Sequence, residues 1–137
     1  DMIQSMNTGH DGSLSTGHAN SPQDMLSRLE TMALFASDIP IQAIRKQIAS
    51  SIDIIVQLER LRDRSRRVTA IAEVLDCTED AYILNPIFEF HEQDNLVMES
   101  SSYGDIPERV VGQLERTGYH LIHRRKLHAA ALESAEI

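Results

Sequence analysis

The sequence has few of the residues that form disulfides, aromatic cores or membrane anchors. It contains no tryptophan, and aromatic residues make up 4% of its 137 residues, so any core must be built from aliphatic side chains. Cys77 is the only cysteine, which excludes a disulfide within the chain and favours a reducing compartment. No apolar run approaches the roughly 20 residues that a membrane-spanning helix needs, and nothing resembles a signal peptide.

Positive charge is also scarce. The formal net charge is -8 at pH 7 and the pI is about 5.1, which argues against a nucleic-acid partner held by broad charge neutralisation. The densest basic run is interrupted by acidic residues, which is typical of a solvent-exposed turn. Its members are Arg60, Arg62, Arg64, Arg66 and Arg67.

The composition that remains is that of one globular domain. Hydrophobic residues make up 42% of the chain and charged residues 25%, and the length suits a single core. The sequence starts at Asp1 without methionine, and DMIQSM places its apolar residues on one helical face. We therefore expect a fragment of a longer protein.

The first half of the chain predicts one strand and two helices. Residues 12–19, GSLSTGHA, alternate small and apolar side chains, which predicts a short and tightly covered strand. Asn20 or Ser21 as N-cap, followed by Pro22, predicts a helix that ends near SDIP at residues 37–40. A second helix is predicted from Pro40 to about residue 52, because its isoleucines form one apolar stripe.

The second half predicts strands and a closing helix. Residues 53–63 and 66–76 are rich in β-branched side chains and flank RDRSR, which predicts a hairpin with an arginine-rich turn. Further strands are predicted in residues 81–90, 95–100 and 107–118, although the last range also has helical features. Alanine and leucine predict a helix over residues 123–135.

The opening stretch, TGHDGSLSTGHANS, carries the candidate site and leaves three readings open. In the first, glycines allow close approach to a phosphate at the start of the following helix, with His10, Thr16 and His18 as donors. In the second, His10, Asp11 and His18 ligate a metal, although no further ligand stands at a familiar spacing. In the third, the stretch is a tight turn whose histidines are satisfied locally. The other histidines are expected to be solvated: His91, His120, His123 and His128.

These residues also carry a family resemblance. The segment MNTGHDGSLSTGHANSPQDMLSRLETM resembles the histidine box and following helix of the ATPases of type II and type IV secretion and pilus assembly, with the CpaF branch most similar. IRKQIASSIDIIVQLERLRDRSRRVTAIAEV is similar to the helix and hairpin that follow, and GQLERTG with HRRKLHAAAL resembles the C-terminal end. The resemblance is weakest over residues 91–109.

The resemblance implies a fold and an activity. The fold would be α/β, the C-terminal part of a RecA-like P-loop ATPase domain with a mostly antiparallel extension. Residues 1–75 would hold the histidine box, the helices and the start of the hairpin, and residues 76–137 the C-terminal strands and terminal helix. The parent would be a homohexamer in the cytoplasm, peripheral at the inner membrane and in contact with its secretion or pilus platform proteins, and would use ATP and Mg²⁺.

The resemblance also assigns the site residues. His10 and His18 would be the catalytic histidines of the box and would sense the nucleotide phosphates. No metal ligand is assigned to the protein. The residues that would support nucleotide binding are Gly9, Gly12, Thr16, Gly17 and Asn20.

One family motif is missing. The sequence has no GxxxxGK[ST] loop, and neither Lys46 nor Lys126 follows a glycine. Such a loop supplies the lysine and backbone cradle for the phosphates and the hydroxyl ligand of Mg²⁺. We therefore expect this chain alone to bind no cofactor and to be inactive, and to self-associate if missing strands expose apolar surface. The alternative function is a non-enzymatic module that docks onto secretion machinery.

Overall fold

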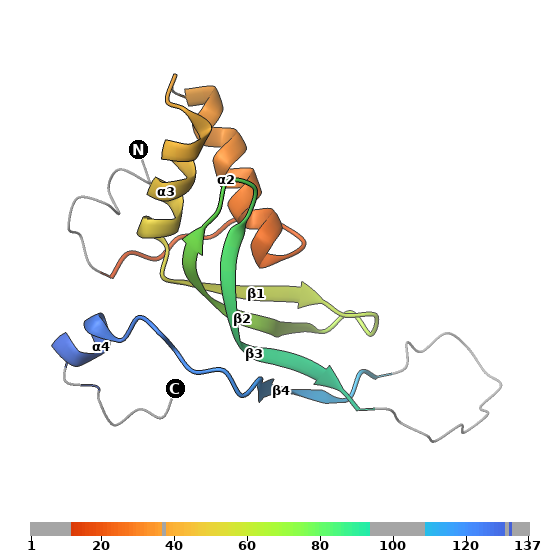
Figure 1. Cartoon of the computed structure of the whole chain (residues 1–137). Helices are drawn as coiled ribbons and strands as arrows, with labels where there is room; N and C mark the ends of the chain where they lie inside the picture. Colours follow the sequence, from red (N-terminus) through yellow and green to blue (C-terminus); the bar gives the residue numbers. More distant parts are fainter. Residues whose placement is uncertain (1–11, 37, 94–108, 131, 133–137) are drawn as a thin grey trace.

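The computed structural model describes residues 12–36, 38–93, 109–130 and 132. Figure 1 shows two helices packed on one side of a curved sheet, with a third, short helix near the end of the chain. The sheet has four antiparallel strands in the order β1-β2-β3-β4. The predicted combination of helices with a mostly antiparallel sheet is therefore confirmed. The elements are α2 (Pro22–Ala36), α3 (Ile41–Ser51), β1 (Ile54–Arg60), β2 (Arg66–Cys77), β3 (Tyr82–Glu92), β4 (Gly112–Arg116) and α4 (Arg125–Ala129).

The two packed helices begin where the sequence predicts. The hydroxyl of Ser21 accepts a hydrogen bond from the backbone N–H of Asp24 at 3.1 Å, and Pro22 occupies the first helical position. Helix α3 begins directly after Pro40 without a side-chain cap. Both starts and the N-cap at Ser21 confirm the sequence-based expectation.

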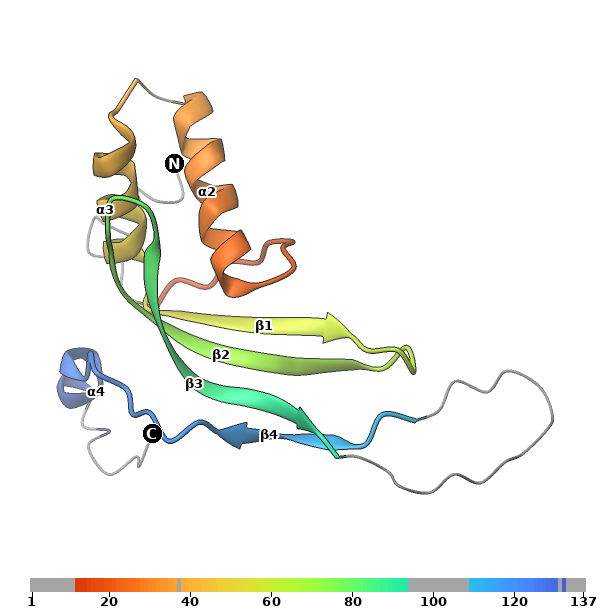
Figure 2. The same ribbon diagram turned by 45° about the vertical axis from the view of Figure 1, so that its right-hand side comes forward.

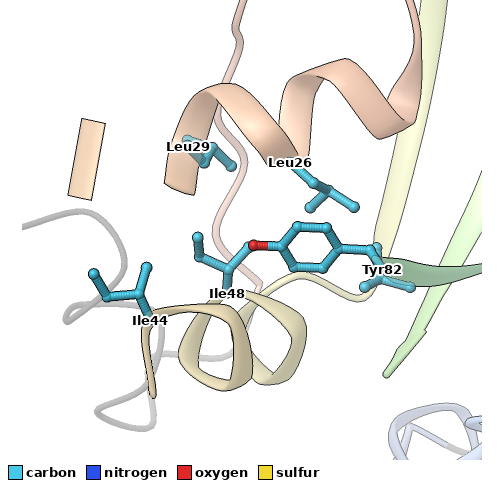
Figure 3. Packing of buried hydrophobic residues seen from close by; sticks show 6 residues of the cluster. Leu26, Leu29, Ile44, Ile48 and Tyr82 are labelled. Carbon is cyan, nitrogen blue, oxygen red and sulfur yellow. The ribbon is translucent and has the colours of Figure 1, made fainter. Parts of the chain in front are cut away.

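The core lies between these helices and the sheet. Leucines of α2 face isoleucines of α3, and Tyr82 closes the cluster from the start of β3 (Figure 3). An aliphatic core with little aromatic surface is what the composition predicts. The buried members of the cluster are Leu26, Leu29, Ile44, Ile48, Val74 and Tyr82.

A polar cluster joins the helices to the turn between β2 and β3. The guanidinium of Arg45 donates to both carboxylate oxygens of Glu30, with N–O distances of 2.7 and 3.1 Å, and the Tyr82 hydroxyl donates to Glu30 at 3.1 Å. Arg45 also donates to the backbone carbonyl of Glu79. The hydrogen bond from Arg45 lowers the pKa of Glu30. These contacts fix the positions of α2 and α3 relative to the turn.

The arginine-rich hairpin is confirmed, and so are the strands predicted around residues 81–90 and 107–118. The strand predicted at residues 95–100 lies outside the described residues. The helix predicted over 123–135 is present only over Arg125–Ala129 among the residues described there. None of the helices in the described ranges is both long and apolar enough to cross a lipid bilayer.

The strand predicted at residues 12–19 is wrong. The described part of this segment forms no strand, and the side chain of Leu14 is 100% exposed. A strand needs a partner for its backbone hydrogen bonds, and the alternation of side chains is not enough where no neighbouring strand pairs with the segment.

The hairpin turn is held by Asp63, whose protonation should loosen it. One carboxylate oxygen accepts the Ser65 hydroxyl at 2.6 Å and the Ser65 N–H at 2.9 Å, and the other accepts the Val110 N–H at 2.9 Å. The Ser65 hydroxyl bond is the largest of the causes that lower the pKa of Asp63 from 3.8 to about 2. The link to Val110 ties the turn to the segment that leads into β4.

Because the folded pKa of Asp63 is depressed, the stability it contributes is complete above pH 3.8 and is lost as the pH falls toward 2. Acid titration followed by the amide signals of Ser65 and Val110 should show this loss in the wild type. In the Asp63→Asn variant the same signals should no longer titrate with a midpoint near pH 2. An unchanged titration in the variant would contradict the assignment.

Candidate functional site

The candidate site is the segment that leads into α2. Figure 2 shows this segment entering α2 at the end of the helix that lies nearest to β1. The structure describes Gly12, Thr16, Gly17, His18 and Asn20, whereas His10 and Gly9 lie outside the described residues. The roles assigned to these residues from the sequence stay predictions.

The backbone around His18 is held by side chains from two different elements. The guanidinium of Arg28, on α2, donates to the carbonyl oxygen of His18 at 2.7 Å. The amide of Gln57, on β1, donates to the carbonyl oxygen of Ala19 at 3.1 Å. Two successive peptide carbonyls are therefore tied to a helix and to a strand, which fixes the path of the chain at His18.

Gly17 lies under the side chain of Met25. A Cβ atom at Gly17 would come within 2.5 Å of the Met25 methyl carbon and 2.7 Å of its sulfur, so a larger residue at this position would require the flexible end of the Met25 side chain to move. Gly12 has a φ of +87°, in the left-handed region that glycine adopts without strain. The two glycines thus have different local roles, one in packing and one in backbone direction.

The side chains of this segment face solvent, although its backbone is anchored. Thr16, His18 and Asn20 are all exposed, and the interaction described for His18 is made by its backbone carbonyl. An exposed imidazole on a fixed backbone is free to meet a ligand that approaches from outside. Hydroxyl, imidazole and amide groups at these three positions can all donate hydrogen bonds to an anion.

The start of α2 offers less to an anion than the sequence suggests. Pro22 has no N–H, and the Asp24 N–H is already bound by Ser21, which leaves the Gln23 N–H in the first turn. The exposed carboxylate of Asp24 also stands at this helix end. Donors for a phosphate would therefore come mainly from the segment before the helix.

A metal centre has no support within the described ranges, where no three histidine, cysteine or acidic side chains gather closely enough to hold an ion. The metal reading of the sequence involves His10 and Asp11, which lie outside those ranges. The histidines that were expected to be solvated are exposed, namely His91, His120, His123 and His128.

A second anchoring point, which the sequence analysis did not identify, lies on β2. The carboxylate of Glu73 is 1% exposed. It accepts the backbone N–H groups of Ile122 and His123, at 2.9 and 2.7 Å, and the Asn85 side-chain amide at 2.9 Å. Asn85 donates further to the carbonyl oxygen of His120 at 2.9 Å. One buried carboxylate and one amide therefore fasten the segment before α4 to the sheet.

Two opposing effects act on the pKa of Glu73. Burial would raise it, but the hydrogen bonds from Ile122, His123 and Asn85 outweigh burial, and the pKa is lowered. The imidazole of His123 lies 3.7 Å from the carboxylate and adds to the lowering when it is protonated. Glu73 is therefore ionised at neutral pH although it is buried.

Sequence reasoning missed Arg28, Gln57 and Glu73 as the residues that hold these segments. Glu73 gives one signal, because it interrupts the otherwise apolar run TAIAEVL in a strand, and a charge in such a run needs partners. Gln57 gives a similar signal in IIVQL and is 8% exposed. Arg28 gives none, because an arginine on an exposed helix face is ordinary.

Comparison with known proteins finds one matching family and several similar proteins. A family model described as "Type II/IV secretion system protein" matches residues 1–105. A putative conjugal transfer protein of Mycobacterium tuberculosis is 31% identical over 72 residues, which are 53% of this chain and 20% of that protein. The probable conjugal transfer protein TrbB of Sinorhizobium fredii is 37% identical over 73 residues, 53% of this chain and 21% of that protein.

A third relative gives the same coverage. The conjugal transfer protein TrbB of Rhizobium radiobacter is 33% identical over 73 residues, again 53% of this chain and 21% of that protein. The chain therefore spans about one fifth of the length of the curated relatives it matches.

Proposed function

Because this chain belongs to the family of type II/IV secretion system proteins, we propose that it is the phosphate-sensing part of an ATPase that drives secretion, conjugal transfer or pilus assembly. The relatives named for conjugal transfer support the family-level role. The finer assignment, to the CpaF branch and to pilus assembly, rests on the sequence resemblance alone. A RecA-like parent domain, its assembly as a homohexamer, its place at the inner face of the membrane beside platform proteins, and the division of the chain at residue 75 belong to the same proposal.

The observation that carries the proposal is the way the backbone at His18 is held. Arg28 and Gln57 bind the carbonyls of His18 and Ala19, and the imidazole of His18 remains exposed. A side chain with this support meets a ligand with little loss of backbone freedom, because the ordering cost has been met in folding. Such preorganisation suits a group that detects whether a phosphate is present.

The donor set fits one side of a nucleotide phosphate site. ATP with Mg²⁺ would supply the phosphoryl bond to be cleaved. His18 and Thr16 would donate hydrogen bonds to phosphate oxygens, Asn20 would support them, and His10 would contribute a second imidazole. Gly9, Gly12 and Gly17 would allow the backbone to approach the phosphate. The sequence contains no lysine-bearing phosphate loop, so the chain alone is proposed to be inactive.

Replacing His18 in the full-length protein tests the proposal. In His18→Ala, kcat for ATP hydrolysis should fall at least about tenfold, because a positioned donor to the transferring phosphate is lost. The Tm should change little, since the interaction described for His18 uses its backbone, which alanine retains. Steady-state phosphate release and thermal unfolding give the two readouts.

The matched control is His120→Ala, which removes another exposed histidine whose described hydrogen bond also uses the backbone carbonyl. Its kcat should stay within about twofold of the wild type. Equal activity in the two variants would contradict the sensing role of His18. A full-length protein without ATPase activity would contradict the motor and favour the interaction module.

A further inference from the structure

The five arginines of the β1–β2 hairpin divide into two groups. Arg62 forms an ion pair with Glu92 at the end of β3. Arg67 donates to the carbonyls of Gly112 and Val110 at 3.2 and 3.3 Å, and its guanidinium lies 5.8 Å from the centre of the Phe90 ring. These two arginines hold β3 and β4 against the hairpin and so have a structural role.

The other three are exposed, and no hydrogen bond or ion pair of their side chains is found in the part of the chain that the structure describes. We call Arg60, Arg64 and Arg66 the arginine tip. They lie at the end of β1, in the turn and at the start of β2. In Figure 1 this turn projects away from the helices. The tip therefore presents three guanidinium groups to the surroundings.

The arginine tip carries two local costs. Arg60 and Arg66 are directly opposite each other in the antiparallel register, and like charges in this position are destabilising. Arg64 has a φ of +67°, which disfavours any residue with a Cβ and is usually occupied by glycine, asparagine or aspartate. Local rules broken without compensation within the fold are most often found at functional sites.

A complementary surface exists on the same protein but at the other end of β2. The last residues of β2 and the turn that follows expose Asp76, Glu79 and Asp80, which we call the acidic turn. The guanidinium of Arg45 lies beside this turn, where it donates to the backbone carbonyl of Glu79 and attracts Asp80, but its carboxylate partner is Glu30. Strand β2 has 12 residues, which at roughly 3.3 Å per residue span at most about 36 Å, and the two turns lie at opposite ends of this curved strand (Figure 1). The tip and the acidic turn of one molecule therefore cannot neutralise each other.

We propose that the arginine tip docks on the acidic turn of a second copy of this chain. Guanidinium forks bind carboxylates in paired hydrogen bonds, and this local attraction between facing surfaces must exceed the repulsion between two copies that each carry a net charge of -8. Because each copy offers both surfaces, the contact is head-to-tail and builds a ring or an open filament. The inference extends the ring assembly of the proposed function and names the surfaces that form it.

Two charge-reversed variants test this contact. The tip variant carries Arg60→Glu, Arg64→Glu and Arg66→Glu, and the turn variant carries Asp76→Lys, Glu79→Lys and Asp80→Lys. Sedimentation velocity at about 0.1 M salt, where the Debye length is about 10 Å and the repulsion between distant charges of the two copies is largely screened, should show self-association of the wild type. Each variant alone should associate at least about tenfold more weakly, because its own surfaces now repel each other.

A mixture of the tip variant and the turn variant provides the decisive experiment. In the mixture, the glutamates of one variant face the lysines of the other, and the wild-type surfaces also meet, so association should return. Raising the salt to about 1 M, where the Debye length is about 3 Å, should dissociate the wild type and the mixture. Circular dichroism checks that both variants fold. If the tip variant does not fold, the milder double variant Arg60→Gln with Arg66→Gln takes its place.

Three results would overturn the proposal. They are a wild type that stays monomeric at the lower salt concentration, variants that associate as well as the wild type, and a mixture that stays as weak as its components. Loss of binding to anionic vesicles or to nucleic acid in the tip variant, with self-association intact, would also overturn it and assign the tip to that ligand. ATP hydrolysis is not needed in any arm, so failure here is separate from failure of the proposed function.

Discussion

Replacing Glu73 by alanine should lower the free energy of unfolding by about 3 kcal/mol, because three donors, one of them the buried side chain of Asn85, would lose their acceptor together. The donors are the backbone N–H groups of Ile122 and His123 and the side chain of Asn85. Removing the carboxylate leaves each of them with an unmet hydrogen bond unless water enters. The segment before α4 should then separate from the sheet more often than the rest of the fold opens.

Two measurements separate this local effect from general destabilisation. Urea unfolding gives the change in free energy, and hydrogen exchange should show faster exchange at Ile122 and His123 than at the centre of β2. Glu89→Ala is the control, because Glu89 is an exposed glutamate on the neighbouring strand and its loss should cost less than about 0.5 kcal/mol. Equal losses of unfolding free energy in the two variants would contradict this role of Glu73.

Acid should weaken the same hydrogen bonds, because it protonates the carboxylate of Glu73. The pKa of Glu73 is lowered in the folded protein from its ordinary 4.5, so its contribution to stability is complete above pH 4.5 and is lost as the pH falls through the folded pKa. The wild type should therefore lose more stability than Glu73→Ala on acidification below pH 4.5.

The fold was predictable where local signals and side-chain periodicity agreed. Ser21 and Pro22 marked the start of α2, and the apolar stripe with Ile44 and Ile48 marked α3. The arginine-rich turn separated two β-branched runs that pair as β1 and β2. In these places each residue's local preference and its burial point to the same structure.

The strand expected at residues 12–19 failed because pairing is not a local property. Leu14 alternates correctly with its neighbours but is fully exposed, and nothing in the spacing of side chains reveals whether another strand lies alongside. The contacts of Arg28 with His18 and of Gln57 with Ala19 were not predictable for a similar reason. They join residues 10 and 38 positions apart through side-chain geometry that only the fold establishes.

The candidate site was predictable as a segment but not as an arrangement. Glycines and histidines identify the stretch before α2, since they are the residues that permit close approach and donate to anions. Its backbone is anchored by residues of α2 and β1, and these elements come close to the segment only when the chain folds. The anchoring residues thus had to come from the structure, whereas the exposed donors could be named from the sequence.

Truncating Leu26 to alanine should destabilise the protein by about 2 to 5 kcal/mol, because the residue belongs to the hydrophobic cluster that joins α2, α3 and the sheet. Leu26 is 0% exposed, so alanine leaves a cavity as well as lost apolar contact. The same helix carries Arg28, which holds the carbonyl of His18. Loosening α2 should therefore also increase hydrogen exchange in the segment before it.

Leu34→Ala is a matched control, because it makes the same chemical change in the same helix at a position that is 41% exposed. Intrinsic helix propensity changes equally in the two variants, so the difference between their unfolding free energies reports burial alone. That difference should exceed about 1.5 kcal/mol. If Leu34→Ala cost as much as Leu26→Ala, the packing of α2 on α3 and β2 would have to be different, and with it the support that α2 gives to the backbone of His18.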